Sequence, residues 1–190
     1  MRKIDSDYEN PIDNVLIDSG LKTLPFFKSI GFTPNLITTL SLIFGLISVF
    51  YLHKDNNLLF GVFYLISYFF DCIDGMMARK YKMVSKFGDY YDHAKDIVVF
   101  ILLMYYLLKR YKFTKNLMLY SILILFYLLS FVHLDCQEKI YAKKDESSAL
   151  SFLNGLCNKE NAKKTIKLTK YFGLGTATLV FIITPFYLKK

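Results

Sequence analysis

One stretch of this chain gathers residues whose side chains could do chemistry. Asp71 and Asp74 are three positions apart, so on a helix they lie on one face, about one turn from each other. Gly88, Asp92 and Asp96 follow at intervals of four and line one stripe of the next helix. If the link between these two helices lets them run antiparallel, all four carboxylates point into one cleft.

These residue types suit a particular chemistry. Carboxylates gathered in this way repel one another unless a cation neutralises them. Ligand sets made only of oxygen suit hard divalent ions such as Mg²⁺, Mn²⁺ or Ca²⁺. Arg79 adds a planar fork that matches a phosphate, and Gly75 and Gly88 let a bulky ligand approach the backbone. Together the residues predict metal-assisted chemistry on a diphosphate.

The spacing as a whole has a known counterpart. The pattern D-x2-D-G-x2-A-R-x8-G-x3-D-x3-D, which runs from Asp71 to Asp96, resembles the signature of the CDP-alcohol phosphotransferases at every fixed position. Members of that family are polytopic helical membrane enzymes, usually with six spans and often dimeric. The resemblance implies an enzyme of phospholipid synthesis that moves a phosphoalcohol from a CDP-linked donor to an acceptor hydroxyl and releases CMP.

The resemblance also implies roles for individual residues. Mg²⁺ or Mn²⁺, two ions in all, is expected at Asp71, Asp74, Asp92 and Asp96, and Asp96 is also expected to be the general base that takes the proton of the acceptor. Substrate contacts are expected from seven residues: Asn35, Thr38, Gly75, Ala78, Arg79, Ser85 and Gly88. No Ser-His-Asp or Cys-His arrangement accompanies these groups, so direct transfer without a covalent enzyme intermediate is expected.

The identity of the acceptor stays open. His93 directly follows Asp92, and an Asp-His pair at this point resembles the choline and ethanolamine branch of the family. Alternatively, His93 is a packing histidine at the membrane interface. His133 and Asp135 either shape the acceptor pocket or are plain interfacial residues. Two substrate pairs follow: CDP-diacylglycerol with a polar alcohol, or CDP-choline or CDP-ethanolamine with diacylglycerol.

The composition is that of a membrane protein. Hydrophobic residues make up 54% of the 190-residue chain, and the mean hydropathy is +0.31. The net charge of +8 fits Lys and Arg that attract anionic lipid; no nucleic-acid motif accompanies it, so membrane lipids are the expected partner and nucleic acid is not. The three cysteines are irregularly spaced and predict neither a disulfide framework nor a zinc site; Cys72 is expected to be a packing residue.

The hydropathy pattern predicts an all-α, polytopic membrane protein with about five to six transmembrane helices. Residues 1–33 are expected to form a polar tail and an amphipathic helix in the membrane interface, broken or bent at Pro25. A CDP-alcohol phosphotransferase membrane domain is expected over 34–190, with spans at about 34–53, 58–78, 88–108, 116–134 and 171–188. The apolar run within the Lys-rich segment 137–170 is too short to cross a bilayer by itself, so whether this segment holds a sixth span is left open.

The distribution of Lys and Arg predicts the orientation. With the N-terminus in the cytosol, the cytosolic segments hold sixteen Lys and Arg and the opposite segments seven, so the cleft is expected to face the cytosol. A divalent-cation transporter is a rival interpretation, but the spans are apolar beyond Asp96, where a permeation path needs polar groups. A catalytically inactive scaffold is a third, which the presence of every motif aspartate disfavours.

Overall fold

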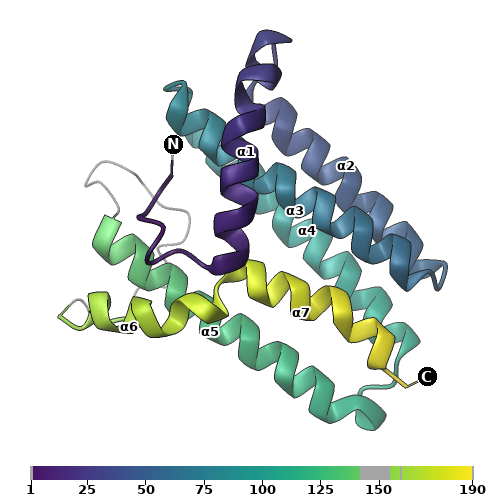
Figure 1. Ribbon diagram of the computed structural model, residues 1–190. Coiled ribbons are helices and arrows are strands. Elements are labelled where there is room, and N and C mark those ends of the chain that lie inside the picture. Colours follow the sequence, from purple (N-terminus) through teal and green to yellow (C-terminus); the bar gives the residue numbers. More distant parts are fainter. Residues whose placement is uncertain (1, 142–154, 159, 190) are drawn as a thin grey trace.

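The computed structural model of the protein describes residues 2–141, 155–158 and 160–189 (Figure 1). Within these ranges all regular structure is helical, which confirms the all-α class. The α-helices in chain order are α1 (Pro11–Ser29), α2 (Pro34–His53), α3 (Asn57–Lys80), α4 (Lys86–Arg110), α5 (Leu117–Tyr141), α6 (Ala162–Thr169) and α7 (Leu174–Tyr187). Short 3-10 turns at Thr114–Asn116 and Lys170–Phe172 precede α5 and α7.

Helix α1 begins at a capped proline. The side chain of Asn10 accepts a hydrogen bond from the Ile12 amide at 3.0 Å, and Pro11 follows the cap, where its missing amide hydrogen costs nothing. The helix packs against α3, and its first turn lies beside the start of α7 (Figure 1). Pro25 lies inside the helix, which continues to Ser29, so the alternative in which this proline ends the helix is wrong.

Helix α2 is the common neighbour of α3 and α4, because small residues on it allow close approach. A β-carbon added at Gly45 would lie 2.9 Å from Val99 on α4 and 3.2 Å from the Ser67 hydroxyl on α3. Thr33 caps α2, and Pro34 takes its first position. The facing parts of α3 and α4 are therefore brought together beside α2.

A five-residue link joins α3 to α4 and reverses the chain direction (Figure 1). Lys82 in this link has a positive φ of 55°, which turns the backbone sharply. Ser85 then caps α4, since its hydroxyl accepts a hydrogen bond from the Gly88 amide at 3.0 Å. The two helices run antiparallel, the arrangement that the cleft requires.

Four helical stretches are long and apolar enough to cross a membrane: Pro34–His53, Asn57–Lys80, Thr114–Ile140 and Ala162–Tyr187. Within the described residues this count is lower than the five to six expected. The difference lies in α4, whose charged first turns leave only 97–108 apolar. The last stretch is interrupted at Gly173, where the backbone is extended with a ψ of 174°. The open question of a span in 137–170 falls partly on 142–154, outside the described residues.

The disulfide part of the cysteine prediction is wrong. Cys136, near the end of α5, forms a disulfide with Cys157 across 21 positions of sequence. Three buried residues complete a small cluster around it: Ile4, Ala162 and Ile166. Irregular spacing along the chain cannot show that these segments meet, which is why the pairing was missed. Cys72 packs beside the buried cluster of Leu24 and Ile73, in keeping with its expected packing role.

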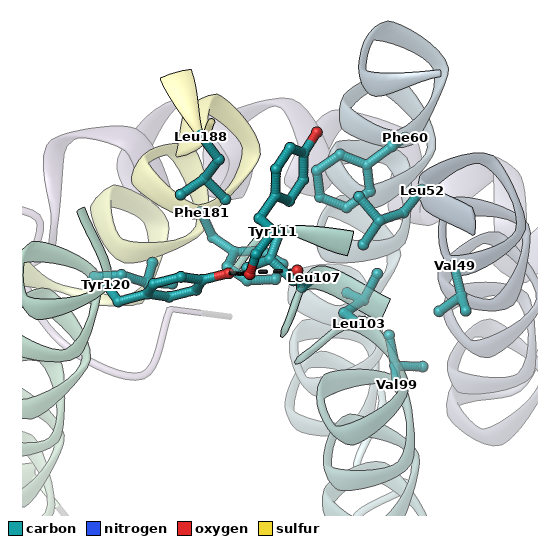
Figure 2. Close-up of a cluster of buried hydrophobic side chains, with 11 residues drawn as sticks. Val49, Leu52, Phe60, Val99, Leu103, Leu107, Tyr111, Tyr120, Phe181 and Leu188 are labelled. Carbon is teal, nitrogen blue, oxygen red and sulfur yellow. Dashed lines mark hydrogen bonds between the residues drawn. The ribbon is translucent and has the colours of Figure 1, made fainter. Parts of the chain in front are cut away.

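The largest apolar core in the described part of the chain begins at Val99, about one helical turn after Asp96, and extends away from the carboxylates (Figure 2). It joins the last turns of α2 and α4 to the start of α3 and to α5 and α7. Its buried members are Val49, Leu52, Phe60, Val99, Leu103, Leu107, Tyr111, Tyr120, Leu123, Phe181 and Leu188. The Tyr120 hydroxyl points to two carbonyl oxygens, of Leu107 at 3.3 Å and Tyr111 at 3.2 Å, so its polar end is satisfied.

Candidate functional site

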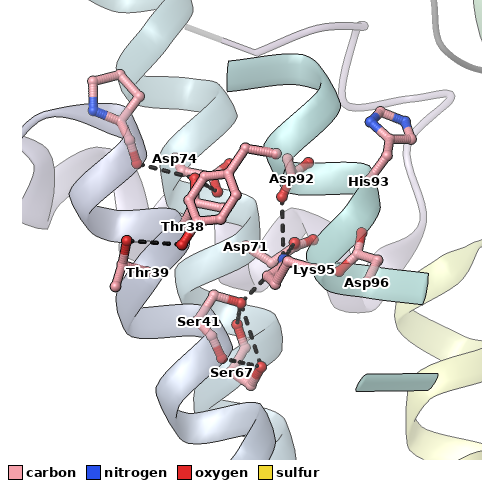
Figure 3. A network of polar contacts seen from close by, with 12 residues as sticks. Thr38, Thr39, Ser41, Ser67, Asp71, Asp74, Asp92, His93, Lys95 and Asp96 are labelled. Atoms are coloured by element: carbon pink, nitrogen blue, oxygen red, sulfur yellow. Dashed lines mark hydrogen bonds and ion pairs between the residues drawn. The ribbon is translucent and has the colours of Figure 1, made fainter. Parts of the chain in front are cut away.

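Two antiparallel helices bring the carboxylates together. Asp71 and Asp74 lie in the last turns of α3, and Asp92 and Asp96 in the first turns of α4 (Figure 3). One oxygen from each of Asp71, Asp74 and Asp92 lies within 4.8 Å of the other two. That spacing suits ligands of one hard divalent cation, which sit about 2.0–2.6 Å from such an ion. Asp96 lies outside this group of three.

The side chain of Asp74 is fixed from α2. Asp74 is 5% exposed, and the Thr38 hydroxyl donates to its Oδ2 at 2.7 Å. Thr38 itself is buried, and its hydroxyl also lies 3.1 Å from the Pro34 carbonyl oxygen. Thr38 was expected to contact substrate; in the structure it both lines the cavity described below and orients a carboxylate.

The cluster contains a cation that the sequence interpretation overlooked. Lys95 is 4% exposed, and its Nζ lies 2.8 Å from Asp96 Oδ1 and 3.1 Å from Asp92 Oδ1 (Figure 3). It also forms an ion pair with Asp71. A lysine between two motif aspartates, at the charged start of an apolar helix, is a signal that could have identified it.

Two serines on the neighbouring helices hold this lysine. Lys95 Nζ donates to the Ser41 hydroxyl of α2 at 3.1 Å. The Ser41 hydroxyl donates to the Ser67 carbonyl oxygen of α3 at 2.9 Å, and the Ser67 hydroxyl donates to the Ser41 carbonyl oxygen at 2.7 Å. No motif contains these serines, so only the packing of α2 on α3 shows their place in the site.

The donor set fits a metal ion. Asp92 Oδ1 is buried, and the Lys95 ammonium 3.1 Å from it is shared with Asp71 and Asp96. Such an oxygen is costly to bury unless a cation completes its surroundings. Since all the candidate ligand atoms are carboxylate oxygens, the site is suited to a hard divalent ion rather than to a softer metal.

A cavity of about 430 Å³ opens beside the carboxylates, a size typical of small-ligand sites. All seven residues expected to contact substrate line it: Asn35, Thr38, Gly75, Ala78, Arg79, Ser85 and Gly88. Asp74 and Asp92 line it as well, whereas Asp71 and Asp96 are not among its lining residues in the described chain. The lining is of mixed charge: Arg79, Lys3 and Lys86 lie among four carboxylates, and Lys3 is paired with one of these, Glu138. Arg79 and Lys86 supply the positive charge that suits an anionic ligand.

Each of the two motif glycines leaves room for a different neighbouring group. A β-carbon at Gly75 would lie 3.1 Å from Nη1 of Arg79, so the absence of a side chain leaves room for the guanidinium. A β-carbon at Gly88 would lie 3.0 Å from both the Asn35 amide oxygen and the Ser85 hydroxyl. Gly88 therefore lets the start of α4 approach the start of α2, where both helices meet the cavity.

The structure also separates the histidines. His93 lines the cavity, and its Nδ1 lies 2.8 Å from the Asp89 carbonyl oxygen. His133 is buried between Thr169, 3.1 Å from its Nδ1, and Gln137, 2.9 Å from its Nε2. Asp135 accepts a hydrogen bond from the Cys157 amide at 2.7 Å. His133 and Asp135 join α5 to the C-terminal segments and do not line the cavity, which favours their interpretation as plain interfacial residues over a role in the acceptor pocket.

Comparison with known proteins places this geometry in a family. A family model for CDP-alcohol phosphatidyltransferase matches residues 32–187. The chain is 34% identical over 68 residues to archaetidylinositol phosphate synthase of Pyrococcus horikoshii, a match that covers 36% of each chain. It is 32% identical over 71 residues to an uncharacterised protein of Aquifex aeolicus, covering 37% of this chain and 36% of the relative.

These relatives match over only part of their length, and no solved structure matches the chain. The family model, by contrast, runs from just before α2 to the end of α7 and includes every carboxylate of the site. With four helices apolar enough to span a bilayer, the protein is an integral membrane protein. It belongs to the CDP-alcohol phosphatidyltransferase family.

Proposed function

We propose that this protein transfers a phosphoalcohol group from a CDP-linked donor to an acceptor hydroxyl, releasing CMP, as a step of phospholipid synthesis. One observation carries the proposal: a single cavity joins phosphate-binding groups to a carboxylate cluster. Arg79, whose guanidinium fits beside Gly75, supplies the phosphate-binding group. Asp74 and Asp92 belong to the carboxylate cluster. Membership of the family supports the same reaction.

The expected cofactor is a divalent ion, Mg²⁺ or Mn²⁺. Asp71, Asp74 and Asp92 would hold it, because they offer oxygens at the right mutual spacing. Bound there, it would supply Lewis-acid stabilisation of the charge that develops on the diphosphate. Thr38 fixes one of these ligands, so α2 takes part in the site without itself carrying a motif carboxylate.

The chain's own residues account for the remaining steps. Arg79 binds phosphate oxygens of the donor through its two-pronged guanidinium. Asp96, whose side chain is 55% exposed, accepts the proton of the acceptor hydroxyl. The acceptor oxygen then bonds to the phosphorus that carries the alcohol, in line with the bond to CMP that breaks. Asn35, Ser85 and Gly88 form the wall that receives the nucleotide.

A CDP-linked lipid is the proposed donor and a polar alcohol the proposed acceptor. The alternative is CDP-choline or CDP-ethanolamine with diacylglycerol, which His93 suggested. Similarity to a protein named archaetidylinositol phosphate synthase favours the lipid-linked donor. Lys86 and Arg79 in the lining suit an acceptor or donor that carries phosphate.

The placement in the membrane is also a proposal. The excess of Lys and Arg on the segments next to the site supports a cytosolic cavity and contact with anionic lipid. The division into an interfacial part, 1–33, and a membrane domain, 34–190, agrees with a family match that begins at residue 32. A homodimer is proposed from the family resemblance and is tested by light scattering of the purified protein in detergent.

The decisive experiment measures CMP release by the full chain in lipid nanodiscs. CDP-diacylglycerol or CDP-archaeol is supplied with a panel of alcohols, with and without Mg²⁺ or Mn²⁺, and CDP-choline with diacylglycerol forms a separate arm. We expect CMP only when donor, acceptor and metal are all present. Asp96→Asn should lower the rate about 10²–10⁴-fold while donor binding is retained.

Asp7→Asn is the matched control, since Asp7 is an exposed carboxylate that does not line the cavity, and it should keep full activity. Absence of CMP release with every donor would refute the transferase proposal. Metal flux into sealed vesicles without CMP release would instead support the transporter. That outcome is disfavoured because α4 continues beyond Asp96 into the apolar core at Val99 and Leu103.

A further inference from the structure

Lys95 has no part in the expected metal and substrate set, yet it lies among the carboxylates. Its side chain is 2% exposed, and its Nζ contacts oxygens of Asp71, Asp92 and Asp96 (Figure 3). An ammonium buried to this degree is stable only with charged or hydrogen-bonding partners around it. The three carboxylates on α3 and α4 provide them.

The position of this ammonium competes with a second metal ion. An ion bridging Asp71 and Asp96 would need their oxygens at about 2.0–2.6 Å, in the space that Nζ occupies. The carboxylates therefore cannot surround two divalent ions while the lysine remains in place.

The surroundings keep the lysine there. Nζ donates to the Ser41 hydroxyl, and Ser41 is itself tied to Ser67, so the ammonium is anchored on the side of α2 and α3. Asp74 has no ion pair with Lys95 among the described contacts and is held by Thr38 instead. The end of the cluster at Asp74, which lines the cavity, is thus left to a metal ion.

We propose that the Lys95 ammonium takes the place of a second metal ion, so that this protein binds one divalent ion, at Asp71, Asp74 and Asp92. The resemblance to the family implies two ions, and we expect one in their place. The existence of the metal site itself rests on the proposed function. In this role Lys95 is a positioning residue that holds the Asp96 carboxylate by a fixed charge.

The test is the stoichiometry of Mn²⁺ binding to the purified full chain, measured by electron paramagnetic resonance of free Mn²⁺ with and without saturating CDP. We expect one ion per chain in both conditions. Lys95→Ala should raise the number to two, because it removes the charge and opens the space. Lys95→Met should stay at one, because it removes the charge but fills the space. Lys112→Met, at an exposed lysine outside the site, is the matched control and should also bind one.

Two Mn²⁺ ions per wild-type chain would overturn the inference, as would one ion in a folded Lys95→Ala protein. If that variant does not fold, the wild-type number alone decides. The failure of this inference is distinguishable from failure of the proposed function: CMP release with two bound ions removes only the role of Lys95. Absence of CMP release removes the transferase itself.

Discussion

The two ends of the bundle formed by α2, α3 and α4 are built from the same helices but have opposite interiors. At one end, four carboxylates and a buried ammonium meet beside a cavity. At the other, Val49, Phe60 and Leu103 pack with aromatic side chains from α5 and α7. We refer to these as the polar end and the apolar end.

The comparison shows that each of these helices contributes to the site with one part of its length and to the apolar core with another. Like charges held together at the polar end oppose folding unless cations balance them. Close packing at the apolar end supplies the stability that the polar end lacks. Substitutions on one helix should therefore affect activity at one end and stability at the other.

The largest effect is expected at the polar end. Asp74→Asn removes a ligand charge from the group that could bind the metal, and CMP release should fall about 10³-fold. The melting temperature should not fall, because one charge in a crowded set of carboxylates is lost. A rate assay and a thermal melt of the same sample check both parts. A melting temperature much below that of the wild type would show that Asp74 also supports the fold.

The apolar end should show the reverse. Leu103→Ala leaves a cavity in the core and should lower the free energy of unfolding by about 2–5 kcal/mol, measured by denaturant titration in micelles. Activity below the melting transition should be kept. Ile101→Ala on the same helix is the control, since Ile101 is 58% exposed and its truncation should have little effect. Equal losses for the two variants would contradict the assignment of the core.

A smaller effect is expected for Thr38, which orients the proposed metal ligand Asp74. Thr38→Val removes the hydrogen bond to Asp74 and should weaken metal affinity about 10–100-fold. Thr38→Ser should restore it, because the hydroxyl returns. Thr39→Val, at a neighbour whose hydroxyl meets Tyr91 instead, should leave the affinity unchanged. Metal titration by calorimetry distinguishes these variants, and a Thr38→Val protein with wild-type affinity would exclude this role.

The smallest effect concerns a buried carboxylate that belongs to neither end. Asp13 on α1 is held by the Tyr68 hydroxyl at 2.7 Å and the Gly175 amide at 3.2 Å, and burial, reinforced by the nearby Glu9, raises its pKa to about 7. This pKa lies above that of an aspartate in the unfolded chain, so the protonated Asp13 stabilises the folded protein. That stabilisation is complete below about pH 4 and is lost as the pH rises to about 7. The melting temperature should decline over that range by a few degrees.

Asp13→Asn isolates this contribution. The amide cannot ionise, so the variant should lack the part of the decline that Asp13 causes, and the difference between the two melting curves should grow from pH 4 to pH 7. A constant difference across that range would show that Asp13 keeps an ordinary pKa in the folded protein.

Local patterns were sufficient for the helices and for the motif. Long apolar runs placed α2 and α4 to within two residues, because hydropathy acts over neighbouring positions. The motif spacing also predicted that the four carboxylates point into one cleft if α3 and α4 run antiparallel. The helices do so, but only Asp74 and Asp92 line the cavity. Local charge counts did less well for α4, whose polar first turns shorten its apolar part.

The amino-acid sequence by itself determined the class of fold, the carboxylates and the family. Only the tertiary structure decided what surrounds those carboxylates: Thr38 on Asp74, Lys95 among Asp71, Asp92 and Asp96, and the disulfide of Cys136 with Cys157. The physical reason is that helical period and hydropathy are properties of consecutive residues. Contacts between helices depend instead on which small residues, such as Gly45, let distant segments approach.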